Sequence, residues 1–191
     1  MNLRERRRAD TMRAVQRVAL DLFERRGYDA VSIAQIAAEA QVAERTVYRH
    51  FGTKEMLVVH DELDAAFIGD VVRRATTVGA IAGVREALAA VPPEAWRGEG
   101  AEAGGWLRKM RLLRATPSLH ATFERATSTL GDALGAAESA AATGLAPYPA
   151  RVRGRAVAAM LAVAVDAWLE SDGEADLRDL VAQGIDALTT G

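Results

Sequence analysis

The sequence predicts an all-α fold of about nine helices, and three features of its 191 residues lead to this expectation. Half of the residues are hydrophobic, and alanine is prominent relative to β-branched and aromatic types, which favours helix over strand. Apolar residues recur at spacings of three and four, as they do along one face of a helix. The five prolines fall between the candidate helices, at positions 92, 93, 117, 147 and 149.

The apolar periodicity places the helices in order along the chain. The first runs from about Arg8 to Arg26 and stops at Gly27, because glycine readily takes the left-handed conformation that ends helices. Two short helices follow within residues 32–51. The remaining expected helices occupy residues 54–76, 79–91, 106–115, 118–142, 150–170 and 174–189.

Residues 32–51 have the pattern of a helix-turn-helix. Their apolar positions face inward on two short helices, and these positions are Ile33, Ile36, Ala37 and Ala40, then Val42, Val47 and Phe51. The outward residues of the second helix are Glu44, Arg45, Thr46, Tyr48, Arg49 and His50. All of these can donate or accept hydrogen bonds to phosphates and base edges. Because the second helix of such a motif enters the major groove, the pattern predicts contact with double-stranded DNA.

Three segments of this region, residues 19–37, 42–51 and 53–55, resemble the DNA-binding domain of TetR/AcrR-type transcriptional regulators. The pairs Leu-Phe, Gly-Tyr, Ile-Ala and Lys-Glu and the run Thr-x-Tyr-x-His-Phe occur in the family's order and spacing. The resemblance covers about residues 8–58, and the remainder matches only in length and helical character. It implies a helix-turn-helix DNA-binding domain over residues 1–54 and a helical effector-binding and dimerisation domain over residues 55–191.

The resemblance also implies individual roles at the DNA. Thr46, Tyr48, His50 and Lys54 are expected to contact phosphates. Glu44, Arg45 and Arg49 are expected to lie closest to bases, where arginine reads guanine and glutamate accepts from a cytosine amine. Ser32 has the form of a capping box with Gln35, and a capped helix start offers N–H groups to phosphate.

Two positions depart from the family pattern. Gln41 stands where the turn commonly has glycine, and Ala43 stands where serine or threonine usually caps the second helix. A left-handed residue other than glycine costs roughly 1–2 kcal/mol, and a lost cap costs about 1 kcal/mol. Neither departure removes an outward residue, so DNA binding remains the prediction.

Thr53 is expected to cap the helix that follows it.

The net charge of −2 conceals an asymmetry. Residues 1–54 hold 11 Arg and Lys against 7 Asp and Glu, whereas residues 55–191 hold 13 against 19. The N-terminal segment is therefore the one suited to a polyanion. Arginines at positions 4, 6, 7 and 8 suggest a mobile cationic arm for the DNA backbone or minor groove. The alternative is a solvated tail without a partner.

The last two expected helices carry apolar stripes that suggest a homodimer. One stripe comprises Val152, Ala156, Met160, Val163 and Ala167. The other comprises Leu177, Leu180, Val181, Gly184, Ile185 and Leu188. Two such helices per subunit would form a four-helix interface about a two-fold axis, as they do in the resembling family. The alternative is that both stripes close the core of a single chain.

Apolar and histidine side chains of the middle region suggest a pocket for a small hydrophobic effector. The candidates are His60, Phe67, Trp106, Met110, Leu113, His120, Phe123 and Met160. For each residue taken singly, core packing is the simpler interpretation. Arg108, Lys109, Arg111 and Arg114 lie on the same helix as Trp106, either as a solvated face or as an attraction for an acidic ligand.

Several classes of function lack support in the sequence. The three histidines show no HxH or HExxH spacing, and GxSxG, GxxxxGK[ST] and GxGxxG are absent, so we expect no enzyme, metal or cofactor. No apolar run approaches the roughly 20 residues of a membrane span. The basic start lacks the apolar segment of a secretory signal. Without cysteine, the chain suits a reducing cytoplasm.

The resulting hypothesis is a ligand-responsive repressor that binds a palindromic operator as a homodimer. A DNA-binding regulator without a ligand, or an activator, is the first alternative. The second is a helical module that binds a ligand or partner and keeps only a vestigial motif. The sequence does not choose the effector, the operator or the sign of regulation.

Overall fold

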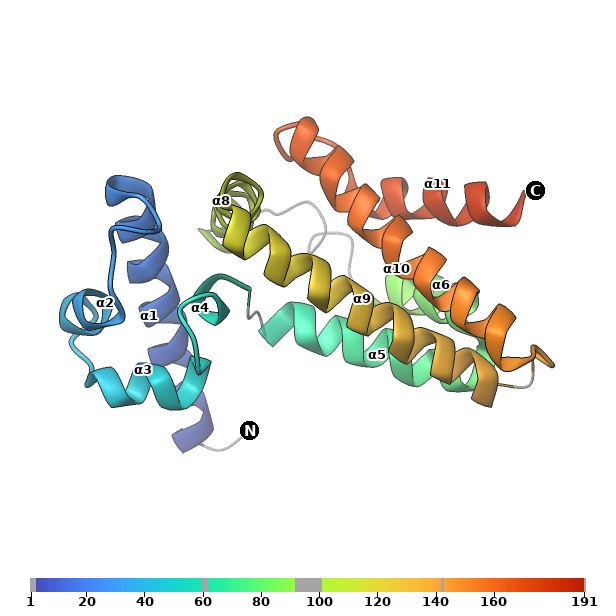
Figure 1. The fold of residues 1–191 in the computed structure, drawn as a ribbon, viewed down its shortest axis with the longest axis horizontal. Coiled ribbons are helices and arrows are strands. Elements are labelled where there is room, and N and C mark those ends of the chain that lie inside the picture. Colours follow the sequence, from blue (N-terminus) through green and yellow to red (C-terminus); the bar gives the residue numbers. More distant parts are fainter. Residues whose placement is uncertain (1–2, 60–61, 92–100, 142, 191) are drawn as a thin grey trace. The chain divides into compact units, whose positions relative to one another are not determined.

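The structure, a computed structural model, describes residues 3–59, 62–91, 101–141 and 143–190 (Figure 1). Within these ranges it contains ten α-helices and no strand. The all-α prediction is therefore confirmed, with one helix more than the nine expected.

Contacts within the chain group its residues into two compact units. Unit 1 comprises residues 1–61 and 108–122, and unit 2 comprises residues 62–107 and 123–191. Helices α8 (Ala101–Ala115) and α9 (Pro117–Ala140) each contribute residues to both units.

Unit 1 contains α1 (Leu3–Arg26), α2 (Ile33–Glu39), α3 (Glu44–Phe51) and α4 (Met56–Val59). Helix α1 packs against α2 and α4, and α2 packs against α3. Gly27 ends α1 with φ +83°, as its position in the sequence predicts. Side chains from all four helices form the fully buried core, and these are Val15, Leu22, Phe23, Ile36, Val47 and Leu57.

The arginine-rich start of the chain is helical. Helix α1 begins at Leu3, so it includes Arg4 to Arg8, and the expectation of a mobile arm is wrong. Residues 3–26 contain neither glycine nor proline. Nothing in the sequence therefore stops the helix before Arg8.

The helix ends around the turn agree with the sequence. The Ser32 hydroxyl accepts a bond from the Gln35 N–H at 3.2 Å, and the Gln35 side-chain oxygen accepts one from the Ser32 N–H at 2.8 Å. This confirms the capping box. Ala43 precedes α3 without a side-chain cap, and Gln41 adopts φ +55°. The structure therefore has both features expected from the departures, an uncapped start of α3 and a left-handed residue other than glycine in the turn.

Replacing Gln41 with glycine is expected to stabilise unit 1 by about 1 kcal/mol, because glycine takes positive φ without the steric penalty of a Cβ atom. Urea unfolding followed by circular dichroism measures the change. Asp172, also at positive φ (56°), supplies a control, since aspartate tolerates this region better and Asp172→Gly should gain less. An unchanged unfolding midpoint for Gln41→Gly would show that the turn is unstrained.

Unit 2 contains α5 (Glu62–Val78), α6 (Ala80–Ala90), α10 (Pro147–Glu170) and α11 (Leu177–Thr189), together with parts of α8 and α9. Helix α5 packs against α6, α10 packs against α11, and both members of the second pair contact α6. Helices α9 and α10 each begin at a proline. Proline lacks a backbone N–H, and this suits the first helical turn because an N–H there has no partner within the helix.

Besides α1, two predicted helices depart most from their expected bounds. The helix expected over residues 54–76 corresponds to α4 and α5, and Lys54 and Glu55 lie in the turn before α4. The Thr53 hydroxyl accepts a bond from the Met56 N–H at 3.4 Å, so Thr53 caps this segment as expected, although α4 begins two residues later than predicted. Helix α8 begins at Ala101 rather than Trp106. The high helix propensity of the alanines at its start offsets the low propensity of Gly104 and Gly105.

Helices α9 and α10 lie side by side in Figure 1. Glycines stand where the two helices approach most closely. A Cβ atom built on Gly154 would lie 2.2 Å from the Gly135 backbone nitrogen and 2.6 Å from the Gly131 carbonyl oxygen. These distances are far below van der Waals contact, and backbone atoms cannot rotate away as a side chain does. The close approach of the two helices therefore requires glycine at position 154.

Gly154→Ala is expected to destabilise the protein by about 3 kcal/mol, the upper part of the range for overpacking. Gly69→Ala is the matched control, because a Cβ atom there would meet nothing within 4 Å. That substitution should instead stabilise α5 by up to about 1 kcal/mol through helix propensity. Equal unfolding midpoints in urea for the two variants would contradict this helix crossing.

Candidate nucleic-acid interface

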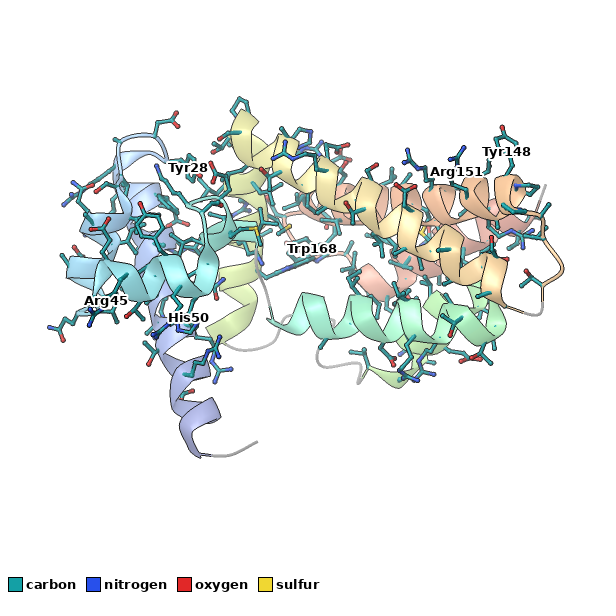
Figure 2. All side chains as sticks on the ribbon, turned by 60° about the horizontal axis from the view of Figure 1, so that its bottom comes forward. Tyr28, Arg45, His50, Tyr148, Arg151 and Trp168 are labelled. Atoms are coloured by element: carbon teal, nitrogen blue, oxygen red, sulfur yellow. The ribbon has the colours of Figure 1, made fainter. Side chains whose placement is uncertain are left out.

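Helix α3 has a polar outer surface and an apolar inner one, as the sequence predicts. Glu44, Arg45, Tyr48 and Arg49 are exposed, and the side chain of Tyr48 is 49% accessible. Arg45 and His50 both lie on α3 in Figure 2. The inner positions Val47 and Phe51 are buried. In this chain, no described element covers the row of hydrogen-bonding side chains that the motif predicts for DNA.

The inner surface fixes the orientation of α3. Val47 is fully buried, and it belongs to the same core as Ile36 of α2 and Phe23 of α1. With only eight residues, α3 would be marginal in isolation. Packing, rather than helix propensity, therefore holds the outer residues in place.

His50 is half-buried at the end of α3. Burial lowers the pKa of its imidazole, and the positive charges of Arg8 from α1 and Arg49 lower that pKa further. The Arg49 Nη2 and His50 Nε2 atoms lie 3.5 Å apart. A DNA phosphate bound beside His50 would raise this pKa, because an anion favours the charged imidazole.

DNA affinity is therefore expected to rise as the pH falls from about 8 to about 6. Free His50 has a pKa below its ordinary value and is neutral at pH 7, and a bound phosphate raises that pKa, so binding takes up a proton. Fluorescence anisotropy at constant ionic strength measures the effect. His50→Gln should have a smaller pH dependence, and an identical slope in both proteins would remove His50 from the phosphate contacts.

Lys54 makes a contact within the protein that its sequence position does not reveal. Its ammonium donates to the Tyr28 carbonyl oxygen at 2.5 Å and lies 4.2 Å from the centre of the Tyr28 ring. Burial lowers the pKa of Lys54, while Asp29 and Glu55 oppose that shift. Tyr28 also packs against Phe23, with ring centroids 4.9 Å apart. Lys54 thus ties the turn after α3 to the turn after α1.

The remaining predicted DNA residues occupy the same unit. Ser32 is exposed at the start of α2, where its hydroxyl accepts the capping bond, and Thr46 is half-buried on α3. The structure therefore brings together all eight residues predicted for DNA, from Ser32 to Lys54, on the helix-turn-helix and its flanking turns.

The predicted effector residues divide between the two units. Met110, Leu113 and His120 belong to unit 1, whereas Phe67, Trp106, Phe123 and Met160 belong to unit 2. Met110, Leu113 and Met160 are buried, and the others are half-buried. His60 lies outside the described residues. Within unit 2, Trp106 packs on Trp168 with ring centroids 4.4 Å apart.

The two apolar stripes of the C-terminal helices are mixed in character. Met160 is buried and its side chain reaches the position where Gly184 would carry a Cβ atom. Val181 and Ile185 are buried as well. In contrast, Val152, Val163 and Leu188 are exposed. Part of each stripe closes unit 2, and part remains on the surface of the single chain.

Sequence reasoning missed two charged residues with defined partners. Arg108, expected on a solvated or ligand-attracting face, pairs with Asp21 and Glu24 of α1. Glu138 is buried beside Arg153 and the start of α6. A signal for Glu138 existed, since it falls four residues after Leu134 on the apolar face of its helix. No comparable signal existed for Arg108.

Known proteins resemble the chain over both of its parts. Residues 17–60 match the family model "Bacterial regulatory proteins, tetR family", and residues 75–191 match the model "MftR C-terminal domain". The second match alone covers more than half of the chain. The chain therefore belongs to the TetR family of bacterial transcriptional regulators.

Individual relatives agree with this assignment. The HTH-type transcriptional regulator TcmR of Streptomyces glaucescens is 32% identical over 127 residues, covering 64% of this chain and 56% of TcmR. The match thus spans about half the length of that relative. The HTH-type transcriptional repressor Rv3405c of Mycobacterium tuberculosis is 47% identical over 51 residues, which are 27% of each protein.

Solved structures share the fold. NalD, described as the secondary repressor of the MexAB-OprM multidrug efflux pump in Pseudomonas aeruginosa, aligns with TM-score 0.57 and 20% identity over 96% of this chain and 95% of its own. FadR of Thermus thermophilus, a TetR-family repressor in complex with lauroyl-CoA, aligns with TM-score 0.53 and 19% identity over 93% of each chain. None of the described helices of the present chain is long and apolar enough to cross a membrane.

Proposed function

We propose that this regulator is a repressor that binds a palindromic operator as a homodimer and leaves it when a small hydrophobic effector binds. The observation that carries the DNA-binding part is the exposed outer surface of α3, held rigidly by Val47 and Phe51 beneath it. Such a regulator acts where the chromosome is, in the cytoplasm.

At the DNA, the exposed side chains divide by chemistry. Arg45 and Arg49 supply the planar donor pairs that read guanine, and Glu44 accepts from a cytosine amine. Thr46, Tyr48 and His50 donate to phosphates, and Ser32 and the start of α2 offer a further phosphate site. Lys54 positions the motif through Tyr28 and directs its remaining N–H groups to the backbone.

Two chains are needed because one α3 makes few base contacts. A dimer reads two half-sites about 34–36 Å apart, in successive major grooves on one side of the duplex. On α10, Val152 and Val163 are exposed by 51% and 64%, and on α11 Leu188 is exposed by 41%. Large apolar side chains in this state favour burial against a second copy.

The effector is proposed to bind among the apolar residues of the middle helices. Trp106, Phe67, Phe123 and Met160 of unit 2 supply aromatic and flexible apolar surface suited to a hydrophobic molecule. Support by analogy comes from FadR, whose structure holds lauroyl-CoA. An effector releases DNA only if it binds the DNA-free state more tightly than the DNA-bound state.

A titration with labelled DNA from immediately upstream of the chain's own coding sequence tests the proposal. Fluorescence anisotropy at low salt should give saturable binding, two chains per site, and a preference over a scrambled duplex of equal length. Lipophilic compounds that raise the thermal transition of the protein should then release the duplex. No binding at low salt would overturn the DNA-binding role, and stabilising compounds that leave the complex intact would overturn the effector role.

A further inference from the structure

The ammonium group of Lys54 is held within unit 1 by one carbonyl oxygen and two aromatic rings. It donates to the Tyr28 carbonyl oxygen at 2.5 Å. The Lys54 Nζ atom also lies 4.2 Å from the centre of the Tyr28 ring and 5.6 Å from the centre of the Phe23 ring. Both distances fall within the roughly 6 Å over which an aromatic face attracts a cation. We call the two rings and the Tyr28 carbonyl the aromatic seat.

The aromatic seat is a fixed part of the fold. Phe23 is fully buried on α1, and Tyr28 is buried in the turn that follows. Between them, the Gly27 N–H donates to the Phe23 carbonyl oxygen at 2.8 Å, and Gly27 turns the chain at φ +83°. The two rings pack on each other with their planes inclined by 53°. A cation in contact with these rings is therefore held at a defined position relative to α1.

The aromatic seat leaves part of the Lys54 ammonium available to another acceptor. A lysine ammonium has three N–H donors, and the Tyr28 carbonyl oxygen takes one of them. An aromatic face attracts the positive charge as a whole rather than a single N–H. Lys54 is half-buried and stands three residues after Phe51, the last residue of α3. The remaining donors therefore lie just beyond the end of the helix that is proposed to face DNA.

We infer that Tyr28 is a positioning residue for DNA binding, and that its ring acts by holding the Lys54 ammonium in place for a backbone phosphate. This inference rests on the proposed function and deepens it. A mobile lysine side chain loses conformational freedom when it binds a phosphate, and this loss opposes binding. In this chain, folding has already restricted Lys54, so the phosphate contact costs less. Because a phosphate carries no base identity, the gain in affinity is the same for every DNA sequence.

Fluorination of the ring at position 28 tests this role with little change of shape. Tyr28→Phe starts the series, and difluorophenylalanine and trifluorophenylalanine then replace the same residue. Each added fluorine withdraws electrons from the ring face, so the attraction for the Lys54 ammonium weakens stepwise. Affinity for the upstream duplex, measured by anisotropy at low salt, should fall by about fivefold over the series. The scrambled duplex should lose affinity by the same factor.

Lys54→Met supplies the matched control. Methionine keeps a flexible, unbranched apolar side chain but carries no charge. In proteins with Lys54→Met, the fluorinated series should bind the duplex with equal affinity, because the ring has no cation left to position. Lys54→Met alone should also reduce the slope of log affinity against log salt concentration by about one, the value for one lost phosphate contact.

The outcomes separate this inference from the proposed function. A stepwise loss of affinity that requires Lys54 supports the inference. Equal affinities across the series, an equal loss with and without Lys54, or complete loss already at Tyr28→Phe overturns it while the proposed function stands. A loss confined to the upstream duplex, or an unchanged salt slope for Lys54→Met, overturns it as well. If the chain with Tyr28 and Lys54 intact does not bind the duplex, the proposed function and the inference both fail.

Discussion

Replacing Arg45 and Arg49 together with alanine is expected to weaken binding to the upstream duplex by at least about 30-fold. Each arginine supplies a base-reading contact worth about 1–3 kcal/mol, and roughly 1.4 kcal/mol corresponds to tenfold in affinity. Both side chains are exposed on α3, so their removal leaves no unpaired group in the core. Folding should be unaffected, and the loss should be greater for the operator than for a scrambled duplex.

Fluorescence anisotropy measures this loss of affinity. A matched variant distinguishes the loss of specific contacts at α3 from a general loss of positive charge. Arg73→Ala with Arg85→Ala removes the same two positive charges from exposed positions on α5 and α6. Its affinity should fall only slightly, because neither arginine is among the residues proposed to contact DNA. Equal losses in the two double variants would mean that α3 contributes no more than general electrostatics.

Glu138→Ala is expected to lower the free energy of unfolding by about 3 kcal/mol. The carboxylate is 1% exposed. Its Oε1 atom accepts from Arg153 of α10 at 2.9 Å, and Oε2 accepts from the backbone N–H of Ala80 at the start of α6. One side chain of α9 therefore joins three helices. Alanine leaves a cavity, an unpaired buried N–H and a cation without its partner.

Urea unfolding followed by circular dichroism measures the effect, and two variants sharpen it. Glu138→Gln keeps an acceptor for the Ala80 N–H but loses the charge, so its loss should be smaller. Asp132→Asn affects an exposed ion pair with Arg155 between α9 and α10, and it should leave the free energy of unfolding unchanged. If Glu138→Ala unfolds at the same urea concentration as Asp132→Asn, Glu138 does not hold α6, α9 and α10 together.

The parts of the fold that depend on neighbours in sequence were accessible to prediction. The capping box of Ser32 and Gln35, the stop at Gly27 and the inner face of α3 each involve residues a few positions apart. Their periodicity and turn chemistry are fixed by backbone geometry. The helical class followed from the same local rules. Bounds were less accurate after Thr53, where the cap is present but Lys54 and Glu55 form a turn before α4.

Contacts between distant residues were not accessible in this way. Arg108 is separated by 84 residues from Glu24, and Glu138 by 58 from Ala80. An arginine on a polar helix face has the same sequence pattern whether it is solvated or paired with carboxylates of another helix. Met160 likewise fits an interface, a pocket or a core by spacing alone, and only its approach to Gly184 identifies packing. The DNA and effector roles of the named residues remain predictions.

Photo-crosslinking from two exposed tyrosines tests most directly whether the outer surface of α3 contacts DNA. Tyr48 on α3 and Tyr148 on α10 are exposed by 49% and 71%, so benzoylphenylalanine can replace either without disturbing the core. Figure 2 shows Tyr148 near the start of α10. Irradiation of the complex with the upstream duplex should attach DNA at position 48 and not at position 148. Binding without attachment at position 48, or attachment only at position 148, would contradict the account.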